Sequence, residues 1–321
     1  MKDELLTCDK SNCSDTTQGF FVSTTKFPHH PLHRAGLLLI VLFYATAAWA
    51  DMPLSERYQR LKSGADVTLP GTTISLASSE QKGLVSADVN TILPYPFDKV
   101  APTLAKAQNW CQFMPLHFNI KACTCEPREK GEILTLYSGR KTYQPPEDSF
   151  ALAYHFEVAQ QEVGQLLLHL HAESGPAGTR DYVIEVGALK VKEGTLLHVH
   201  LSYRTSITSS LLTRGYLSTI GRDKIGFTHI TKDGKSYPVQ GVRGVIERNV
   251  MRYQLAIVAY LSTQSLPAAS RHEAELTKWF KQNDSFPQQL HEMTEKEYLE
   301  IKHKEWDNQQ KLQQALSKHC S

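Results

Sequence analysis

The chain has 321 residues, and its 35 Lys and Arg against 33 Asp and Glu give a formal net charge of +2. So balanced a charge argues against a nucleic-acid-binding surface, and we expect no nucleic-acid partner. Hydrophobic residues make up 41% of the chain, an ordinary fraction for a globular protein.

A short apolar run, Gly36–Ala50, follows a polar N-terminal region. It is too short for a comfortable bilayer span, which takes about 20 residues. The run ends in Ala48-Trp49-Ala50, a small-x-small pattern typical of signal peptide cleavage. We therefore interpret residues 1–50 as a signal peptide with an extended N-terminal region, cut before Asp51. This predicts export across an inner membrane to the periplasm; an uncleaved membrane anchor is the alternative.

The expected mature chain contains four cysteines: Cys111, Cys123, Cys125 and Cys320. Disulfides are common in exported proteins, and four cysteines allow three pairings. We favour a Cys111–Cys123 disulfide, with Cys125 and Cys320 free or paired at long range. A zinc site built on Cys123 and Cys125 competes with this interpretation, but it lacks a second ligand pair at suitable spacing.

After a preamble over residues 51–83, the sequence predicts a strand over Val85–Leu93, which Pro94-Tyr95-Pro96 ends. Two short helices follow, one beginning at Phe97 and one over residues 109–114.

From Phe118 onward the periodicity changes to two, which is typical of strands. Six strand-like runs are separated by turn residues: 118–125, 133–143, 150–158, 165–173, 180–189 and 195–204. Such spacing predicts an antiparallel meander. In the last run Leu197, Val199 and Leu201 alternate with polar residues, so one face of the sheet is expected to pack inward.

The stretch Gly241–Thr263 predicts the helix around which the rest of the chain is organised. It has no proline, and its glycines lie only at the start. Its apolar residues form stripes on opposite sides, one running from Val242 to Tyr260 and one from Met251 to Val258. A helix that is apolar on two sides is covered on two sides. We therefore expect it between the sheet and a later segment.

Two further helices are predicted after Pro267. The first carries Leu276, Trp279 and Phe280, which are candidates for the second cover of the long helix. The second begins at a capping box of Thr294 and Glu297. It has few apolar anchors and mixed charge, so we expect a solvated arm.

The order of a strand, two short helices, an antiparallel meander and a long helix resembles the helix-grip architecture of the START-like (SRPBCC, polyketide-cyclase-related) superfamily. Segments 94–100, Trp110 and Pro115 carry the local match. Segments 136–141, 175–179 and 241–249 are similar to an uncharacterised exported bacterial branch of that superfamily. The resemblance covers Leu84 to Thr263.

The resemblance implies an α+β fold in which a curved antiparallel sheet grips a long helix around an apolar cavity. We expect a START-like ligand-binding domain over residues 84–266 and a C-terminal helical extension over 267–321. The chain departs from the superfamily in this extension and in an insertion, Ile207–Gln240, before the long helix. The superfamily has no shared catalytic set, so the resemblance supplies no catalytic residue.

Common catalytic motifs are missing, and we predict no catalytic residue, cofactor or metal. Two histidine pairs, His169 with His171 and His198 with His200, each lie on one face of a strand. A metal could bridge such pairs. Because a strand separates them, we interpret them as solvent-facing histidines.

Arginines and tyrosines are the candidate ligand contacts. The planar guanidinium suits a carboxylate or phosphate, and buried tyrosines offer polar points in an apolar pocket. The candidates are Arg140, Tyr143, Tyr203, Arg243, Arg248, Arg252 and Tyr253. The alternative is structural: Arg243 pairs with Glu247 one turn later, and the tyrosines are core residues.

We therefore expect a protein that binds a hydrophobic or anionic amphipathic small molecule, such as a lipid, for carriage or sensing. Peripheral contact with a membrane is a further expectation. The alternatives are a cyclase- or hydrolase-type enzyme using the same cavity, and a cell-envelope interaction protein whose cavity has collapsed.

Overall fold

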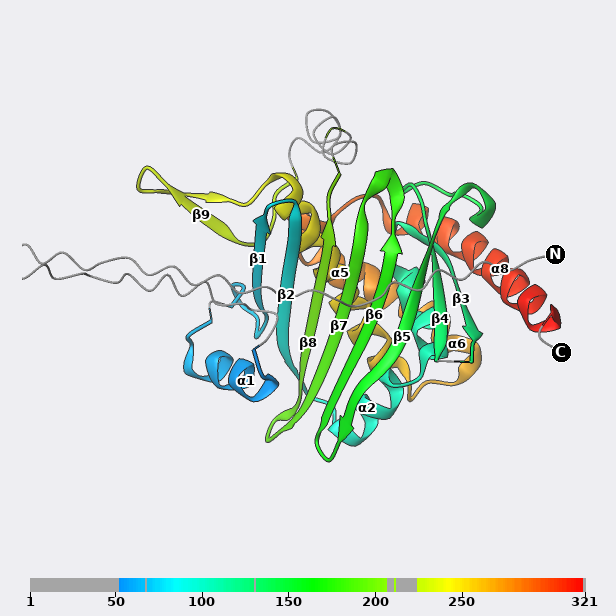
Figure 1. Ribbon diagram of the computed structural model, residues 1–321, viewed down its shortest axis with the longest axis horizontal. Coiled ribbons are helices and arrows are strands. Elements are labelled where there is room, and N and C mark those ends of the chain that lie inside the picture. The colour runs from blue at the N-terminus through cyan, green and yellow to red at the C-terminus, as the bar shows by residue number, and fades with distance from the viewer. Residues whose placement is uncertain (1–51, 67, 130, 207–210, 212–223, 320–321) are drawn as a thin grey trace, which may run out of the picture. The chain divides into compact units, whose positions relative to one another are not determined.

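A computed structural model describes residues 52–66, 68–129, 131–206, 211 and 224–319 (Figure 1). The predicted signal peptide, Cys320 and residues 207–210 and 212–223 of the predicted insertion lie outside these residues.

An eight-stranded antiparallel sheet forms the frame of the protein, with the strand order β1-β2-β8-β7-β6-β5-β4-β3. The strands are β1 Ser75–Gln81, β2 Leu84–Leu93, β3 Ile120–Pro127, β4 Glu132–Ser138, β5 Phe150–Glu162, β6 Gln165–Ser174, β7 Arg180–Val191 and β8 Gly194–Arg204. The predicted meander is confirmed from β3 to β8, and β2 closes it by pairing with β8. Strand β1 lies in the part that was expected to be a preamble.

The described helices are α1 Leu54–Ser63, α2 Phe97–Leu104, α3 Ala107–Phe113, α5 Gly241–Thr263, α6 Ala268–Asp284, α7 Pro287–Leu290 and α8 Glu295–His319. A hairpin of β9 His229–Lys232 and β10 Lys235–Pro238 precedes α5. Helix α5 packs against the sheet from behind in the view of Figure 1. The predicted α+β helix-grip fold is confirmed.

Helix α5 is covered on both sides, as its two apolar stripes predict. Ile246 and Val250 are buried in the core that α5 shares with the sheet. On the other side α6 buries Trp279, whose indole Nε1 donates to the Arg252 carbonyl at 3.0 Å.

Helix α8 is not the solvated arm that its composition suggested. It packs along β3, the last strand of the sheet. The Gln309 side chain accepts from the Cys123 N–H at 2.7 Å and donates to the Cys111 carbonyl at 2.9 Å. Gln313 accepts from the Cys125 N–H at 2.9 Å. Polar side chains of α8 thus satisfy backbone groups of an edge strand, so a count of apolar anchors underestimates how firmly the helix docks.

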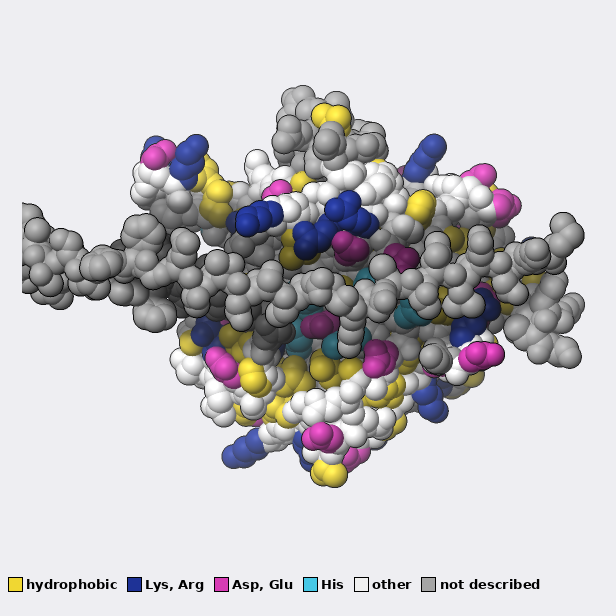
Figure 2. All heavy atoms as spheres, in the orientation of Figure 1, with side chains coloured by type: hydrophobic (Ala, Val, Ile, Leu, Met, Phe, Trp, Pro, Cys, Tyr) yellow, Lys and Arg dark blue, Asp and Glu magenta, His cyan; other side chains and the backbone are white. Residues whose placement is uncertain are grey.

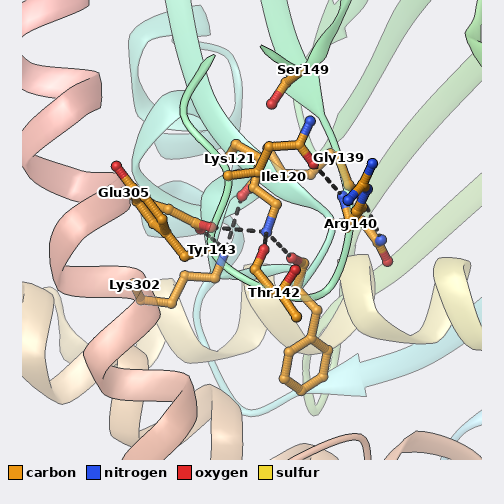
Figure 3. A network of polar contacts seen from close by, with 12 residues as sticks. Ile120, Lys121, Gly139, Arg140, Thr142, Tyr143, Ser149, Lys302 and Glu305 are labelled. Carbon is orange, nitrogen blue, oxygen red and sulfur yellow. Dashed lines mark hydrogen bonds and ion pairs between the residues drawn. The ribbon is translucent and has the colours of Figure 1, made fainter. Parts of the chain in front are cut away.

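A buried ionic network also holds α8 to the sheet (Figure 3). The Glu305 carboxylate accepts from Lys121 Nζ and from Lys302 Nζ, each at 2.8 Å. All three side chains are at most 3% exposed. Both ammonium groups also donate to backbone carbonyls, among them those of Phe118 and Ile120. Every charge in the network is therefore hydrogen-bonded, which buried charges require.

Histidines gather on the face of the sheet turned away from α5 (Figure 2). His198 and His200 are buried there, which corrects the expectation that they face solvent. Their Nδ1 atoms lie 3.0 Å from Asn90 Oδ1 and 3.1 Å from Asp88 Oδ1, respectively. Burial first, and Arg57 next, lower the pKa of His198 to about 3. Among the described residues, no group of His, Cys, Asp and Glu has an arrangement that could hold a metal ion.

A disulfide joins Cys111 of α3 to Cys123 of β3, with their Cα atoms 4.9 Å apart. Cys125 is buried with a free thiol. Burial, and then Glu132, raise the pKa of this thiol to about 11, so it is not a thiolate at neutral pH.

We predict that Glu305→Gln destabilises the protein by about 3–5 kcal/mol, because the substitution leaves two buried ammonium groups without their counter-ion. Urea unfolding measures this loss. Glu300→Gln, on the exposed part of the same helix, is the matched control and should change stability by less than about 0.5 kcal/mol. Equal effects of the two substitutions would show that the network contributes nothing.

Glu275 of α6 gives a second prediction. Burial raises the pKa of this carboxyl to about 7, although Thr263 Oγ1, at 3.2 Å, opposes the shift. Between about pH 4.5 and 7 the folded state therefore keeps a proton on Glu275 that the unfolded state has lost. The contribution of this group to the free energy of unfolding falls as pH rises through that window.

Glu275→Gln should accordingly be more stable than the wild type by about 1–3 kcal/mol near pH 8. The difference should shrink toward about pH 5. Thermal unfolding across this pH range is the measurement, with the exposed Glu273→Gln as control. A pH-independent difference would contradict the assignment.

Candidate ligand-binding site

A cavity of about 420 Å³ lies between α5 and the inner face of the sheet. Side chains of β4, β5, β7 and β8 form one wall and those of α5 the other. The turn Pro176–Gly178 and Glu292, in the connection between α7 and α8, complete the lining. The C-terminal extension thus takes part in the site.

The sheet wall is largely apolar because alternate residues of each strand face the helix. Leu136, Leu152 and Leu201 come from β4, β5 and β8, and Val242 and Val245 face them from α5. An apolar wall of this kind excludes water and favours an apolar guest.

Four tyrosines add polar points to the lining: Tyr154, Tyr182, Tyr203 and Tyr253. The rings of Tyr182 and Tyr203 stack, with centroids 5.1 Å apart, and the Tyr182 hydroxyl lies 2.7 Å from Thr179 Oγ1. Burial raises the pKa of all four hydroxyls. They are therefore protonated at neutral pH and can donate hydrogen bonds to a guest.

Cationic side chains cluster around the single carboxylate of Glu292 in the cavity lining, and we call this part of the cavity its cationic end. Arg252 Nη2 and Lys141 Nζ each lie 2.6 Å from a Glu292 oxygen, and Lys224 Nζ lies at 3.7 Å. Arg248 also lines the cavity, and its Nη1 donates to the Ile225 carbonyl at 3.1 Å. Burial acts to raise the pKa of Glu292, but Arg252, Lys141 and Lys224 outweigh it, so the pKa is lowered. The carboxylate is ionised, and the cations outnumber it.

His117 contributes a buried donor at the same end. Its Nδ1 accepts from the Asn119 N–H at 3.0 Å, which places the proton of the neutral ring on Nε2. Nε2 has no hydrogen-bond partner of standard geometry in the described part of the chain. Burial, together with Arg252 and Lys302, lowers the pKa of this imidazole well below its usual value, although Asn249 acts in the opposite direction.

Of the residues singled out from the sequence, Tyr203, Arg248, Arg252 and Tyr253 line the cavity. The structure brings these four together from β8 and two turns of α5.

Arg140, Tyr143 and Arg243 lie elsewhere. Arg140 is exposed after β4, and Tyr143 is 43% exposed with its hydroxyl accepting from Asn308. Arg243 donates to the Ser78 carbonyl of β1 at 2.9 Å. Arg243 and Arg252 are nine positions apart, about two and a half turns, so they leave α5 on opposite sides.

The alternative pairing of Arg243 with Glu247 takes a different form. The buried Glu247 carboxylate accepts from the backbone N–H groups of Phe227 and Thr228, at 2.6 and 3.0 Å, and from the Ser78 hydroxyl. Arg243 and Glu247 thus meet at Ser78. Together they hold both α5 and the segment before β9 against strand β1.

Three residues of the site were not predicted from the sequence: His117, Lys141 and Glu292. Nothing in the spacing of Lys141 pointed to a carboxylate 151 positions later. His117 lies between Pro115 and a strand, without a pattern that would mark it. These contacts depend on the fold, so only the three-dimensional arrangement shows them.

No protein-family model matches the chain, and no curated protein matches it either. Solved structures that are similar to the chain include a STAR-related lipid transfer protein from Xanthomonas axonopodis, with 16% identity, coverage of 46% of this chain and 86% of that one, and a TM-score of 0.34.

Another is CalU16 from Micromonospora echinospora, with 11% identity, coverage of 66% and 95%, and a TM-score of 0.31. A third is Ara h 8.0201, with 10% identity, coverage of 62% and 99%, and a TM-score of 0.32. The strand order and the position of α5 define the fold.

We predict that the His117 ring stays neutral through the pH range in which an ordinary imidazole takes up its proton, because burial and Arg252 disfavour the imidazolium. Proton NMR of the ring, assigned by its loss in His117→Gln, should show no titration in this range. Since the unfolded state takes up the proton, this group lowers stability as pH falls below about 6.5. A titration midpoint above about pH 6 would contradict the described environment.

Proposed function

We propose that the protein binds an amphipathic small molecule, with the apolar part in the cavity and an anionic head group at the cationic end, for carriage or sensing. One observation carries this proposal: an apolar cavity of about 420 Å³ has basic side chains gathered at one end. That volume falls within the usual range of small-molecule sites, roughly 300–1,000 Å³.

The mechanism is desolvation and needs no bond to be broken. Each methylene group that leaves water for the cavity stabilises the complex by about 0.8 kcal/mol. The head group would find charge-assisted donors, which are stronger than neutral ones. Arg252 and Lys141 already hold a carboxylate at 2.6 Å, so the end of the cavity has the geometry to hold another.

Export to the periplasm is part of the proposal. It is supported by the signal-like pattern before Asp51 and by the Cys111–Cys123 disulfide, since disulfides persist in oxidising compartments. Among the described helices, none is both long and apolar enough to cross a membrane. Peripheral contact with a membrane would let the protein collect a lipid-like ligand there.

An enzyme of the cyclase or hydrolase type is the second candidate, and His117 favours it. The neutral imidazole of His117 lies against the Tyr253 ring, with centroids 5.1 Å apart, and its Nε2–H could donate a hydrogen bond that polarises a bound carbonyl compound. Turnover that His117→Gln abolishes while binding persists would decide for this candidate. An interaction protein with a collapsed cavity requires an interior filled by side chains, and the open volume beside α5 argues against it.

Native mass spectrometry of protein purified from the periplasm tests the proposal. We expect a co-purifying amphipathic molecule on the wild type, and its loss from Val245→Trp, because the indole fills the cavity. Val163→Trp, at a fully exposed hairpin position, is the matched control and should keep the molecule. A wild-type protein that carries nothing and takes up no added alkyl carboxylate would contradict the proposal.

A further inference from the structure

Glu292 occupies the position in which the head group of a ligand would be expected. Its side chain lines the cavity and is 5% exposed. Its two oxygens are held by different cations, Oε1 by Arg252 and Oε2 by Lys141, both at 2.6 Å. The carboxylate of a fatty acid or another organic acid could bind to these two cations in the same way.

The segment that carries Glu292 is separate from the cations that hold it. Arg252 belongs to α5 and Lys141 follows β4, whereas Glu292 lies in the short connection between α7 and α8. Two neighbouring contacts hold the start of this connection: Arg252 Nη2 also donates to the Leu290 carbonyl, at the end of α7, at 3.3 Å, and Lys224 Nζ donates to the His291 carbonyl. The cations that line the cavity therefore also help to hold this connection in place.

The charges that line the cavity favour a carboxylate at this position. Glu292 is the only acidic side chain among the described residues that line the cavity, while Lys141, Arg248 and Arg252 are basic. Nearby, His117 and Asn249 also line the cavity, and their side chains interact with each other. A ligand carboxylate that reached them would find further donors there.

We propose that Glu292 is an internal substitute for the carboxylate of the ligand. A ligand carboxylate replaces it on Arg252 and Lys141, and the connection around Glu292 is released. The exchange is one carboxylate for another, so the cations stay compensated throughout. A neutral ligand of the same length cannot make this exchange and leaves Glu292 in place. The inference rests on the proposed function and adds two properties to it: selection for a carboxylate, and a structural response to it.

The first test compares decanoate with decan-1-ol by isothermal titration calorimetry at low ionic strength. Glu292→Gln removes the competing charge and leaves the cations without their carboxylate. We expect it to bind decanoate at least tenfold more tightly than the wild type does, while its affinity for decan-1-ol changes less than twofold. Glu300→Gln, on the exposed surface of α8, is the matched control and should alter neither affinity.

The two probes separate the possible failures. If neither probe binds the wild type or Glu292→Gln, the proposed function itself fails. If both probes bind the wild type but Glu292→Gln leaves the decanoate affinity unchanged or weaker, Glu292 is only a structural counter-ion and this inference fails alone. Equal gains for both probes would likewise overturn it, because they would reflect a wider cavity and not a removed competitor.

A second test uses the wild type and does not depend on the folding of a variant. Hydrogen–deuterium exchange of peptides covering residues 287–295 should become faster when decanoate binds, because Glu292 loses its partners. Decan-1-ol should leave the exchange of these peptides unchanged. Slower or unchanged exchange with saturating decanoate would overturn the release of the connection.

Discussion

The structure depends on one constraint: α5 is apolar on two opposite sides, so it must be covered on two sides. The sheet covers one side and α6 the other. The sheet, however, meets α5 without filling all the space along it, and the cavity lies in the remainder. The helix that holds the core together is thus also one wall of the site, and it supplies Arg248, Arg252 and Tyr253 to that wall.

The C-terminal extension stabilises this arrangement through polar contacts more than through apolar ones. Gln309 and Gln313 satisfy backbone groups of β3, and Glu305 joins Lys121 of the sheet to Lys302 of α8. The same extension places Glu292 at the cationic end of the cavity. Its docking and the electrostatics of the site are therefore linked, although α8 itself does not line the cavity.

Much of the fold could be predicted from the sequence because periodicity depends on local geometry. The alternation in β8 and the stripes of α5 follow directly from strand and helix periods. The helical period also predicts that Arg243 and Arg252 lie on opposite sides of α5, since this depends only on the number of residues between them. The burial of His198 and His200 could not be predicted, because their surroundings come from distant parts of the chain: β2 lies beside β8 only in the folded sheet, and α1 packs against β7 and β8.

The site was predicted only in part for the same reason. Tyr203, Arg248, Arg252 and Tyr253 lie on elements whose inward faces the sequence marks. Glu292 and His117 lie in short connections without periodicity, and their importance comes from partners far away in the chain. The role of α8 was misjudged because glutamines that bond to an edge strand have the composition of a solvated helix.

The central claim is that the space between the sheet and α5 admits a guest. Crystals of the protein with 10-bromodecanoate would test it most directly, since anomalous scattering locates the bromine. The account predicts a bromine between Leu152 and Val245, with the carboxylate of the probe on Arg252 and Lys141. Bromine found only on the outer surface, or a cavity closed by side chains in a protein that binds the probe in solution, would contradict it.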